Sequence, residues 1–248
     1  MRILLLLTSY FIFTLCTFGE RASKAEEIEI RGLIEDLVYE EIAAAETNFE
    51  LTLEDAQRII DLKNQRKAQF AKCHNAFKEL SKYKEKGLPF LIEHLQDKRQ
   101  SINFRNHYFG NSVGDACYWS IRSQLEDRPA NYSRYGLKRK GKDGKDHTKP
   151  YWAGNAFGEA GLEKWLQANQ KLSYAEKQIK CLTWLLDAEK KIGAEHAGSY
   201  FLNILPLEIR ILERRLENGE KVEDELTRLR SVLETEDVKS VPKDLLPE

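Results

Sequence analysis

The chain has 248 residues, of which 32% are charged and 42% hydrophobic, and its 39 basic and 40 acidic side chains leave a net charge of −1. A net charge this close to zero therefore does not indicate a partner of either charge. The length is sufficient for one good-sized domain or two small ones.

Residues 1–25 predict a secretory signal peptide. A basic start is followed by an uncharged apolar run over residues 3–18, and small residues precede two cleavage points, after Gly19 and after Ala25. The run is shorter than the roughly 20 apolar residues of a spanning helix, which favours a cleaved signal over a retained anchor. A lipid anchor on Cys16 is disfavoured because a leucine precedes it. We therefore expect a secreted, periplasmic or cell-envelope protein with no membrane span after signal cleavage.

Charge is unevenly distributed along the remaining chain. Residues 26–55 hold eleven acidic side chains against one arginine, whereas residues 128–149 hold eight basic side chains against two aspartates. Two solvated faces explain this pattern without a ligand, and a basic loop for an anionic partner is the alternative. We favour the first explanation because such asymmetry is common.

The first half of the body predicts helices. Residues 28–45 carry apolar side chains at helical spacing, and Thr52 to Asp55 has the form of a capping box that opens a helix running to about Leu80. Gly87 ends this helix, and Pro89 lies where a proline is tolerated in the first turn of the next one.

The second half continues this pattern around one long loop. Ser112 to Asp115 and Ser173 to Glu176 are further capping boxes, and residues 162–168 predict a short helix. Between these elements, residues 127–161 are rich in Gly, Asn, Lys and Tyr and predict an irregular loop. Residues 205–233 carry leucines at steps of four and three on both sides of an Asn-Gly turn, which predicts an antiparallel helical hairpin.

The predicted fold class is all-α, with helical hairpins packed as an irregular bundle. The expected organisation is a signal peptide over residues 1–25, a helical domain over 26–198, the C-terminal hairpin over 199–235 packed on it, and a mobile tail over 236–248. Tyr200 to Leu205 could form an extended segment, but a single strand is too isolated to build a sheet.

Residues 70–125 resemble HEAT-type helical repeats. The resemblance rests on a helix, the Gly87 break, the segment from Leu88 to Asp97, and a second helical opening from Val113 to Cys117. It implies paired helices that stack into a curved surface for binding proteins, without chemistry of their own. About fifteen residues separate the two segments and no period is sustained over three units, so no residue-level role is implied.

Candidate chemistry is sparse. The thiols of Cys73, Cys117 and Cys181 lie among apolar helical positions without a CxxC spacing, so we predict no metal site and no cofactor. One disulfide would be allowed after export, with a pairing that sequence cannot choose. A hydrolase-like envelope enzyme is the alternative function, with His107 and Asp115 as its acid–base pair.

The best candidate surface is the aromatic and basic segment 104–165. Exposed rings there would offer flat faces to sugars or cations, and basic side chains suit carboxylates or phosphates; alternatively the rings clamp the loop onto the helices. We expect an exported, non-catalytic binding or scaffold module for a protein or an anionic or polysaccharide envelope component, not for nucleic acid. An oligomer through residues 205–233 is a further option. The candidate binding residues are Tyr108, Trp119, Tyr132, Tyr135, Arg139, Lys140, Tyr151 and Trp152.

Overall fold

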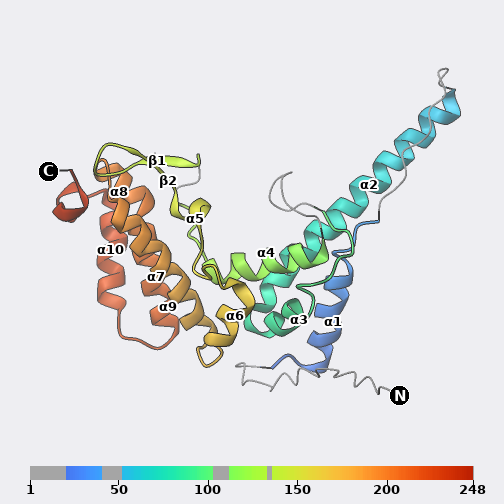
Figure 1. Cartoon of the computed structure of the whole chain (residues 1–248), viewed down its shortest axis with the longest axis horizontal. Coiled ribbons are helices and arrows are strands. Elements are labelled where there is room, and N and C mark those ends of the chain that lie inside the picture. Colours follow the sequence, from blue (N-terminus) through green and yellow to red (C-terminus); the bar gives the residue numbers. More distant parts are fainter. Residues whose placement is uncertain (1–20, 41–51, 103–111, 133–135, 248) are drawn as a thin grey trace, which may run out of the picture.

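The computed structural model describes residues 21–40, 52–102, 112–132 and 136–247, and over these residues it is mostly α-helical (Figure 1). The predicted all-α class is therefore confirmed. The longer helices are α1 (Lys24–Glu35), α2 (Leu53–Leu80), α4 (Val113–Glu126), α6 (Gly161–Ala168), α7 (Tyr174–Ile192), α9 (Leu205–Glu217) and α10 (Glu223–Thr235). The shorter elements are α3 (Leu88–Glu93), α5 (Pro150–Ala153), α8 (Ala197–Asn203), the 3-10 turns η1 (Ser81–Gly87), η2 (Val238–Ser240) and η3 (Lys243–Leu245), and the strands β1 (Lys138–Lys140) and β2 (Asp146–Thr148).

Local capping chemistry sets the helix starts. All three predicted capping boxes are present, at the beginnings of α2, α4 and α7. A fourth, formed by Ser23 and Glu26, opens α1 earlier than predicted. The predicted break between α2 and α3 also exists, with Pro89 in the first turn of α3. In each box the hydroxyl and the carboxylate satisfy backbone N–H groups that have no partner within the helix.

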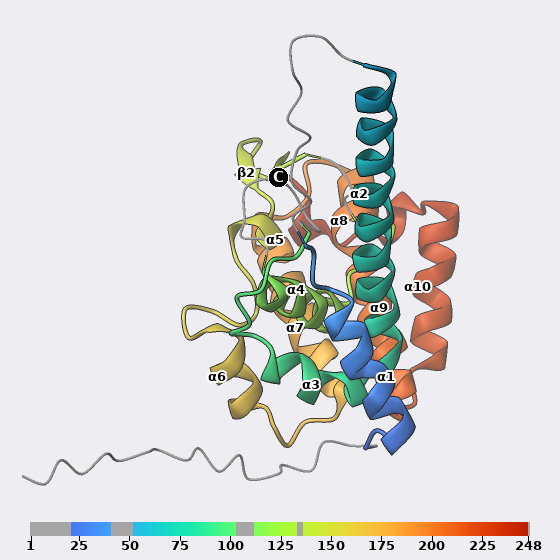
Figure 2. The ribbon, with the colours of Figure 1, turned by 90° about the vertical axis from the view of Figure 1, so that its right-hand side faces the viewer.

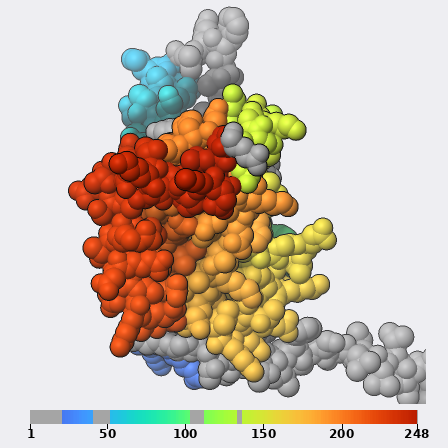
Figure 3. Space-filling model, turned by 90° about the vertical axis from the view of Figure 1, so that its left-hand side faces the viewer, coloured from blue at the N-terminus to red at the C-terminus, as the bar shows by residue number. Residues whose placement is uncertain are grey.

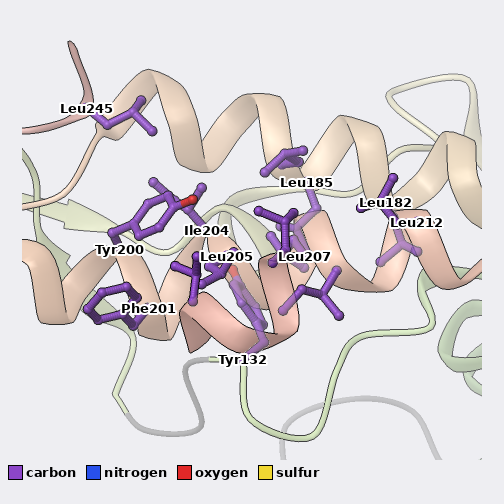
Figure 4. Packing of buried hydrophobic residues seen from close by; sticks show 14 of the residues in the cluster. Tyr132, Leu182, Leu185, Tyr200, Phe201, Ile204, Leu205, Leu207, Leu212 and Leu245 are labelled. Atoms are coloured by element: carbon purple, nitrogen blue, oxygen red, sulfur yellow. The ribbon is translucent and has the colours of Figure 1, made fainter. Parts of the chain in front are cut away.

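The buried side chains form two clusters that meet at α7. The first lies among α1, the C-terminal part of α2, α3, α4 and α6, and Cys181 of α7 belongs to it. The second lies among α7, α8, α9 and α10, with Leu182 and Leu185 of α7 beside Leu205 and Leu212 (Figure 4). The predicted domain boundary at residue 199 falls within this second cluster.

The C-terminal hairpin forms as predicted. Helices α9 and α10 pack together, and the leucines of both predicted stripes lie in or against the second cluster. Asp127, the C-cap residue of α4, accepts hydrogen bonds from Arg214 Nε at 2.6 Å and Nη2 at 3.2 Å, which ties α9 to the first half of the molecule. The segment Tyr200 to Leu205 is helical rather than extended.

Two regions differ from the expectation. The predicted irregular loop 127–161 contains the β1–β2 hairpin and α5. The tail expected to be mobile instead has contacts with the body, because Val241 and Leu245 are buried in the second cluster and the N–H of Ala194 donates to the Leu245 carbonyl at 2.7 Å. Figure 3 shows this red tail lying across the molecule next to the yellow-green hairpin.

Helix α2 extends well beyond the rest of the described structure. Its lower end packs beside α1, whereas its first turns project away from the body (Figures 1 and 2). Cys73 is the first buried residue along α2. The N-terminal two thirds of this helix therefore contribute no buried side chain to either cluster.

Candidate functional site

The β1–β2 hairpin sorts the basic residues of the predicted surface onto two faces. The strands pair antiparallel, with Lys138 opposite Thr148, Arg139 opposite His147 and Lys140 opposite Asp146. Because side chains alternate along a strand, Arg139 lies on the opposite face from Lys138 and Lys140. The two lysines are exposed, while Arg139 turns to the helical body.

A buried carboxylate holds the inner face of the hairpin. Glu189 of α7 is completely buried and accepts hydrogen bonds from Arg139 Nε at 2.8 Å, from Arg139 Nη2 and from the Tyr132 hydroxyl. Arg139 also donates to the carbonyls of Gly193 at 2.6 Å and Glu189 at 3.1 Å. This set of bonds joins the end of α7, the hairpin and the segment before it.

Burial dominates the electrostatics of this cluster. It raises the pKa of the Glu189 carboxyl, against the opposing effect of the Arg139 guanidinium and the Tyr132 hydroxyl. Burial likewise lowers the pKa of Lys149, against the opposing charge of Glu189. Removing water from charged groups is costly unless they are paired, so the cluster depends on all its members being present.

A second anchor holds α5 against α4. Arg122 and Glu126 are both buried and form an ion pair at 2.6 Å, and Arg122 Nη2 donates to the Tyr151 carbonyl at 3.3 Å. Arg128 stacks over the Tyr151 ring at 4.6 Å and lies 3.3 Å from Glu126. The long segment is thus fastened to the helices at both α5 and the hairpin.

The predicted binding residues divide into buried and exposed groups. Tyr132 and Tyr151 are buried and meet edge to face at 5.8 Å, so their rings, like the Arg139 side chain, belong to the anchors. Trp119 is half-buried, with the Arg122 guanidinium 4.9 Å from its ring. Lys140 is exposed and lies 3.7 Å from Glu195. Tyr108 and Tyr135 lie outside the described residues.

An exposed face remains around the hairpin, which we call the hairpin face. It consists of the exposed residues of the hairpin and of the segments next to it. Lys138 and Lys140 lie on the outer side of the hairpin, where Asp146 is opposite Lys140, whereas Leu137 precedes Lys138 and lies on the other side of the strand. Leu137 and Trp152 have 58% and 40% of their surface exposed. The N–H of Lys149 donates to the Leu137 carbonyl, and the N–H of Trp152 donates to the Lys149 carbonyl. Backbone hydrogen bonds therefore connect the hairpin to α5. The exposed Trp152 ring suits a flat ligand, and the exposed lysines suit an anionic one.

Only one member of the alternative catalytic pair, Asp115, lies within the described residues, so the pair stays a prediction. The carboxylate of Asp115 accepts hydrogen bonds from the Ser112 hydroxyl at 2.7 Å and N–H at 3.0 Å, so it serves as a helix cap. His107 lies outside the described residues. Within the part of the chain that is described, no group of three or more His, Cys, Asp or Glu side chains is placed to hold a metal ion, and Cys73, Cys117 and Cys181 are free buried thiols.

A cavity of about 290 Å³ lies between α9, α10 and the segment after α4. Pro129, Pro206 and Ile209 form part of its apolar wall. Its lining contains two arginines and two glutamates, of which Glu213 accepts from Arg210 at 2.9 Å and from Arg230 at 2.7 Å. The equal numbers of basic and acidic side chains give this cavity no preference for an ion of either sign.

Glu189 is the important residue that sequence reasoning missed. It lies seven residues after Leu182 and four after Leu185, so it occupies a position on the apolar stripe of its helix. A charged residue on such a stripe signals a buried partner elsewhere in the chain. The identity of that partner, Arg139 fifty residues earlier, has no local signal.

The fold and the hairpin face define a mostly helical protein that carries a small, firmly anchored β-hairpin. No protein-family model, curated protein or solved structure matches this chain. Over its described residues, the structure contains no helix with both the length and the apolar character needed to cross a membrane.

Proposed function

We propose that this protein is an exported, non-catalytic helical binding module whose hairpin face contacts an acidic protein or an anionic polysaccharide of the cell envelope. The observation that carries the proposal is the division of the hairpin, in which Arg139 is bound by buried Glu189 while Lys138 and Lys140 are exposed on the other side of the strand. Because the hairpin backbone is already fixed, binding has to order only the side chains.

The leader and the paired helices support the two other parts of the proposal. The apolar run over residues 3–18 suits export. Helical hairpins similar to HEAT repeats suit a scaffold role. An envelope hydrolase using His107 and Asp115 remains the weaker candidate, because the carboxylate of Asp115 is engaged by Ser112.

Binding of two defined polymers tests the proposal. Polygalacturonate represents an anionic polysaccharide and poly-L-glutamate an acidic polypeptide, each titrated into the full chain by isothermal calorimetry at low and high salt. We expect binding that weakens with salt, and a loss of about tenfold, or about 1.4 kcal/mol, in the Lys138→Glu/Lys140→Glu variant. Trp152→Ala should weaken polygalacturonate binding more, because sugars stack on the ring.

The matched control is Lys164→Glu/Lys171→Glu, which makes the same change in net charge at two exposed lysines away from the hairpin. This variant should bind as the native chain does. Equal weakening by the control, or no binding of either polymer to the native chain, would overturn the proposal.

A further inference from the structure

The projecting part of α2 carries an apolar seam that the described structure leaves exposed. The side chains of residues 53–72 are exposed or half-buried, a length of about 30 Å at 1.5 Å per residue. Leu53, Ile60 and Phe70 have 92%, 50% and 51% of their surface exposed. A helix segment of this kind gains little stability from propensity alone and normally depends on packing.

The exposed residues follow the spacing of a coiled coil. They recur at steps of three and four on one face, which we call the α2 seam: Leu53, Ala56, Ile60, Lys63, Lys67 and Phe70. The N-terminal half of the seam is apolar, whereas the C-terminal half has two lysines before Phe70. A partner for this seam must therefore offer apolar side chains at one end and acidic groups near the other.

The charges of α2 itself meet this requirement. Residues 53–61 contain three acidic side chains and one arginine, and residues 62–71 contain three basic side chains and no acid. Two such helices side by side in opposite directions set the acidic half of each against the basic half of the other. Parallel packing would instead set like charges together.

We propose that a second copy of this chain covers the α2 seam, with the two α2 helices antiparallel about a two-fold axis. The layers would then pair Leu53 with Phe70, Ala56 with Lys67 and Ile60 with Lys63 of the other copy. The aliphatic stems of the lysines cover the apolar residues while their ammonium groups reach the acidic half of the partner. Such an interface is isologous and closes at the dimer.

The shape of the molecule agrees with this direction. The helical body lies at the C-terminal end of α2 and the projecting turns lie at the other end (Figures 1 and 2). An antiparallel pair places the two bodies at opposite ends of the shared helices, whereas a parallel pair would place them side by side.

Sedimentation velocity on the full chain over about two decades of concentration tests the dimer. The native chain should pass from monomer to dimer, Ile60→Glu/Phe70→Glu should remain a monomer, and Arg58→Glu, on the side of α2 opposite the seam, should behave as the native chain does. Circular dichroism confirms that each variant keeps its helical content. A native chain that is monomeric throughout, or a dimer that the seam variant leaves intact, would overturn the proposal.

Charge exchange tests that the partner is a second copy in this direction. Lys63→Glu/Lys67→Glu should weaken the dimer about tenfold by repelling the acidic half of its partner, and adding Glu54→Lys/Asp61→Lys should restore it. Under mild oxidation, Leu53→Cys/Phe70→Cys should crosslink across the interface, while Leu53→Cys alone should not. Crosslinking by the single variant, or no rescue by the second pair of exchanges, contradicts the antiparallel arrangement.

Discussion

At the residue scale, the determining feature is the buried carboxylate of Glu189 and the guanidinium that faces it. The side chain of Arg139 is 7% exposed and that of Glu189 is 0% exposed, so water screens neither charge. Breaking such a pair leaves an uncompensated charge in the interior, which costs far more than the intact pair contributes.

Arg139→Met is therefore expected to destabilise the protein by about 3 kcal/mol at pH 7, measured by urea unfolding. The control Lys138→Met changes the neighbouring, outward residue and should remain within about 0.5 kcal/mol of the native chain. Similar losses in both variants would mean that the inner face of the hairpin does not depend on Glu189.

The pH dependence of the same variant follows from the direction of the Glu189 shift. Burial raises the folded-state pKa of this carboxyl above its ordinary value of 4.5, so its contribution to stability is full below 4.5 and is lost as pH rises through the raised pKa. Without Arg139 the pKa rises further. The deficit of Arg139→Met should therefore shrink between pH 7 and pH 5, and a deficit that grows on acidification would contradict this assignment.

At the element scale, two helical glycines differ in whether the structure leaves room for a side chain. A Cβ at Gly114, in the first turn of α4, would lie 2.4 Å from the Leu95 carbonyl oxygen, whereas a Cβ at Gly32 in α1 would meet nothing within 4 Å. Gly114 also donates its N–H to the Asp97 carbonyl at 2.9 Å. The close approach of α4 to the turn that follows α3 thus requires the absence of a side chain.

Gly114→Ala should cost about 1–3 kcal/mol through this overlap. Gly32→Ala should instead stabilise by about 0.5–1 kcal/mol, because alanine loses less backbone entropy in a helix. Thermal unfolding of the two variants provides the comparison. A stabilised Gly114→Ala would show that the carbonyls of the preceding turn move aside at little cost.

The elements that sequence predicted best are those whose cause is local. Capping boxes such as Thr52 with Asp55 are complete within four residues, and each begins a helix. The β1–β2 hairpin was missed although Asp143-Gly144 is a frequent turn pair, because its charged strands lack alternating apolar residues. The surface prediction wrongly included Tyr132 and Tyr151, which are buried. Tyr132 bonds to Glu189, which is distant in sequence, and Tyr151 packs under Arg128, which lies outside any periodic pattern, so the sequence has no local sign of their burial.

At the scale of the whole molecule, α1 bears on the proposed export. Ser23 accepts from the N–H of Glu26, and the Glu26 carboxylate accepts from the Ser23 N–H at 2.7 Å and pairs with Lys86 at 3.0 Å. These bonds lower the pKa of Glu26 to about 2. Cleavage after Ala25 would remove the cap of α1, whereas cleavage after Gly19 would preserve it.

Under the proposed export, we therefore expect the mature chain to begin at Glu20. Intact-mass and N-terminal peptide measurements on protein collected outside the cell provide the check, and Ser23→Ala tests the cap separately, at an expected cost of about 1 kcal/mol. A mature chain that begins at Glu26 would show that α1 forms without its capping box.

The two buried clusters share α7, which places Cys181 in one and Leu182 in the other. One helix therefore carries packing for both halves of the molecule, in addition to Glu189 at its C-terminal end. Neither half has a complete interior without α7, so the helical segments that pack in the two clusters should lose their structure together rather than in separate stages.

The docked tail also determines where the protein tolerates an added label. The Asp244 carbonyl accepts from Lys142 Nζ at 2.9 Å, and the Leu245 carbonyl accepts from the backbone of Ala194, so the last turns of the chain join the hairpin to the end of α7. A bulky fusion placed directly after Pro247 would pull on both attachments. A flexible spacer before any such fusion would let affinity chromatography or imaging proceed without disturbing the lysines that face outward.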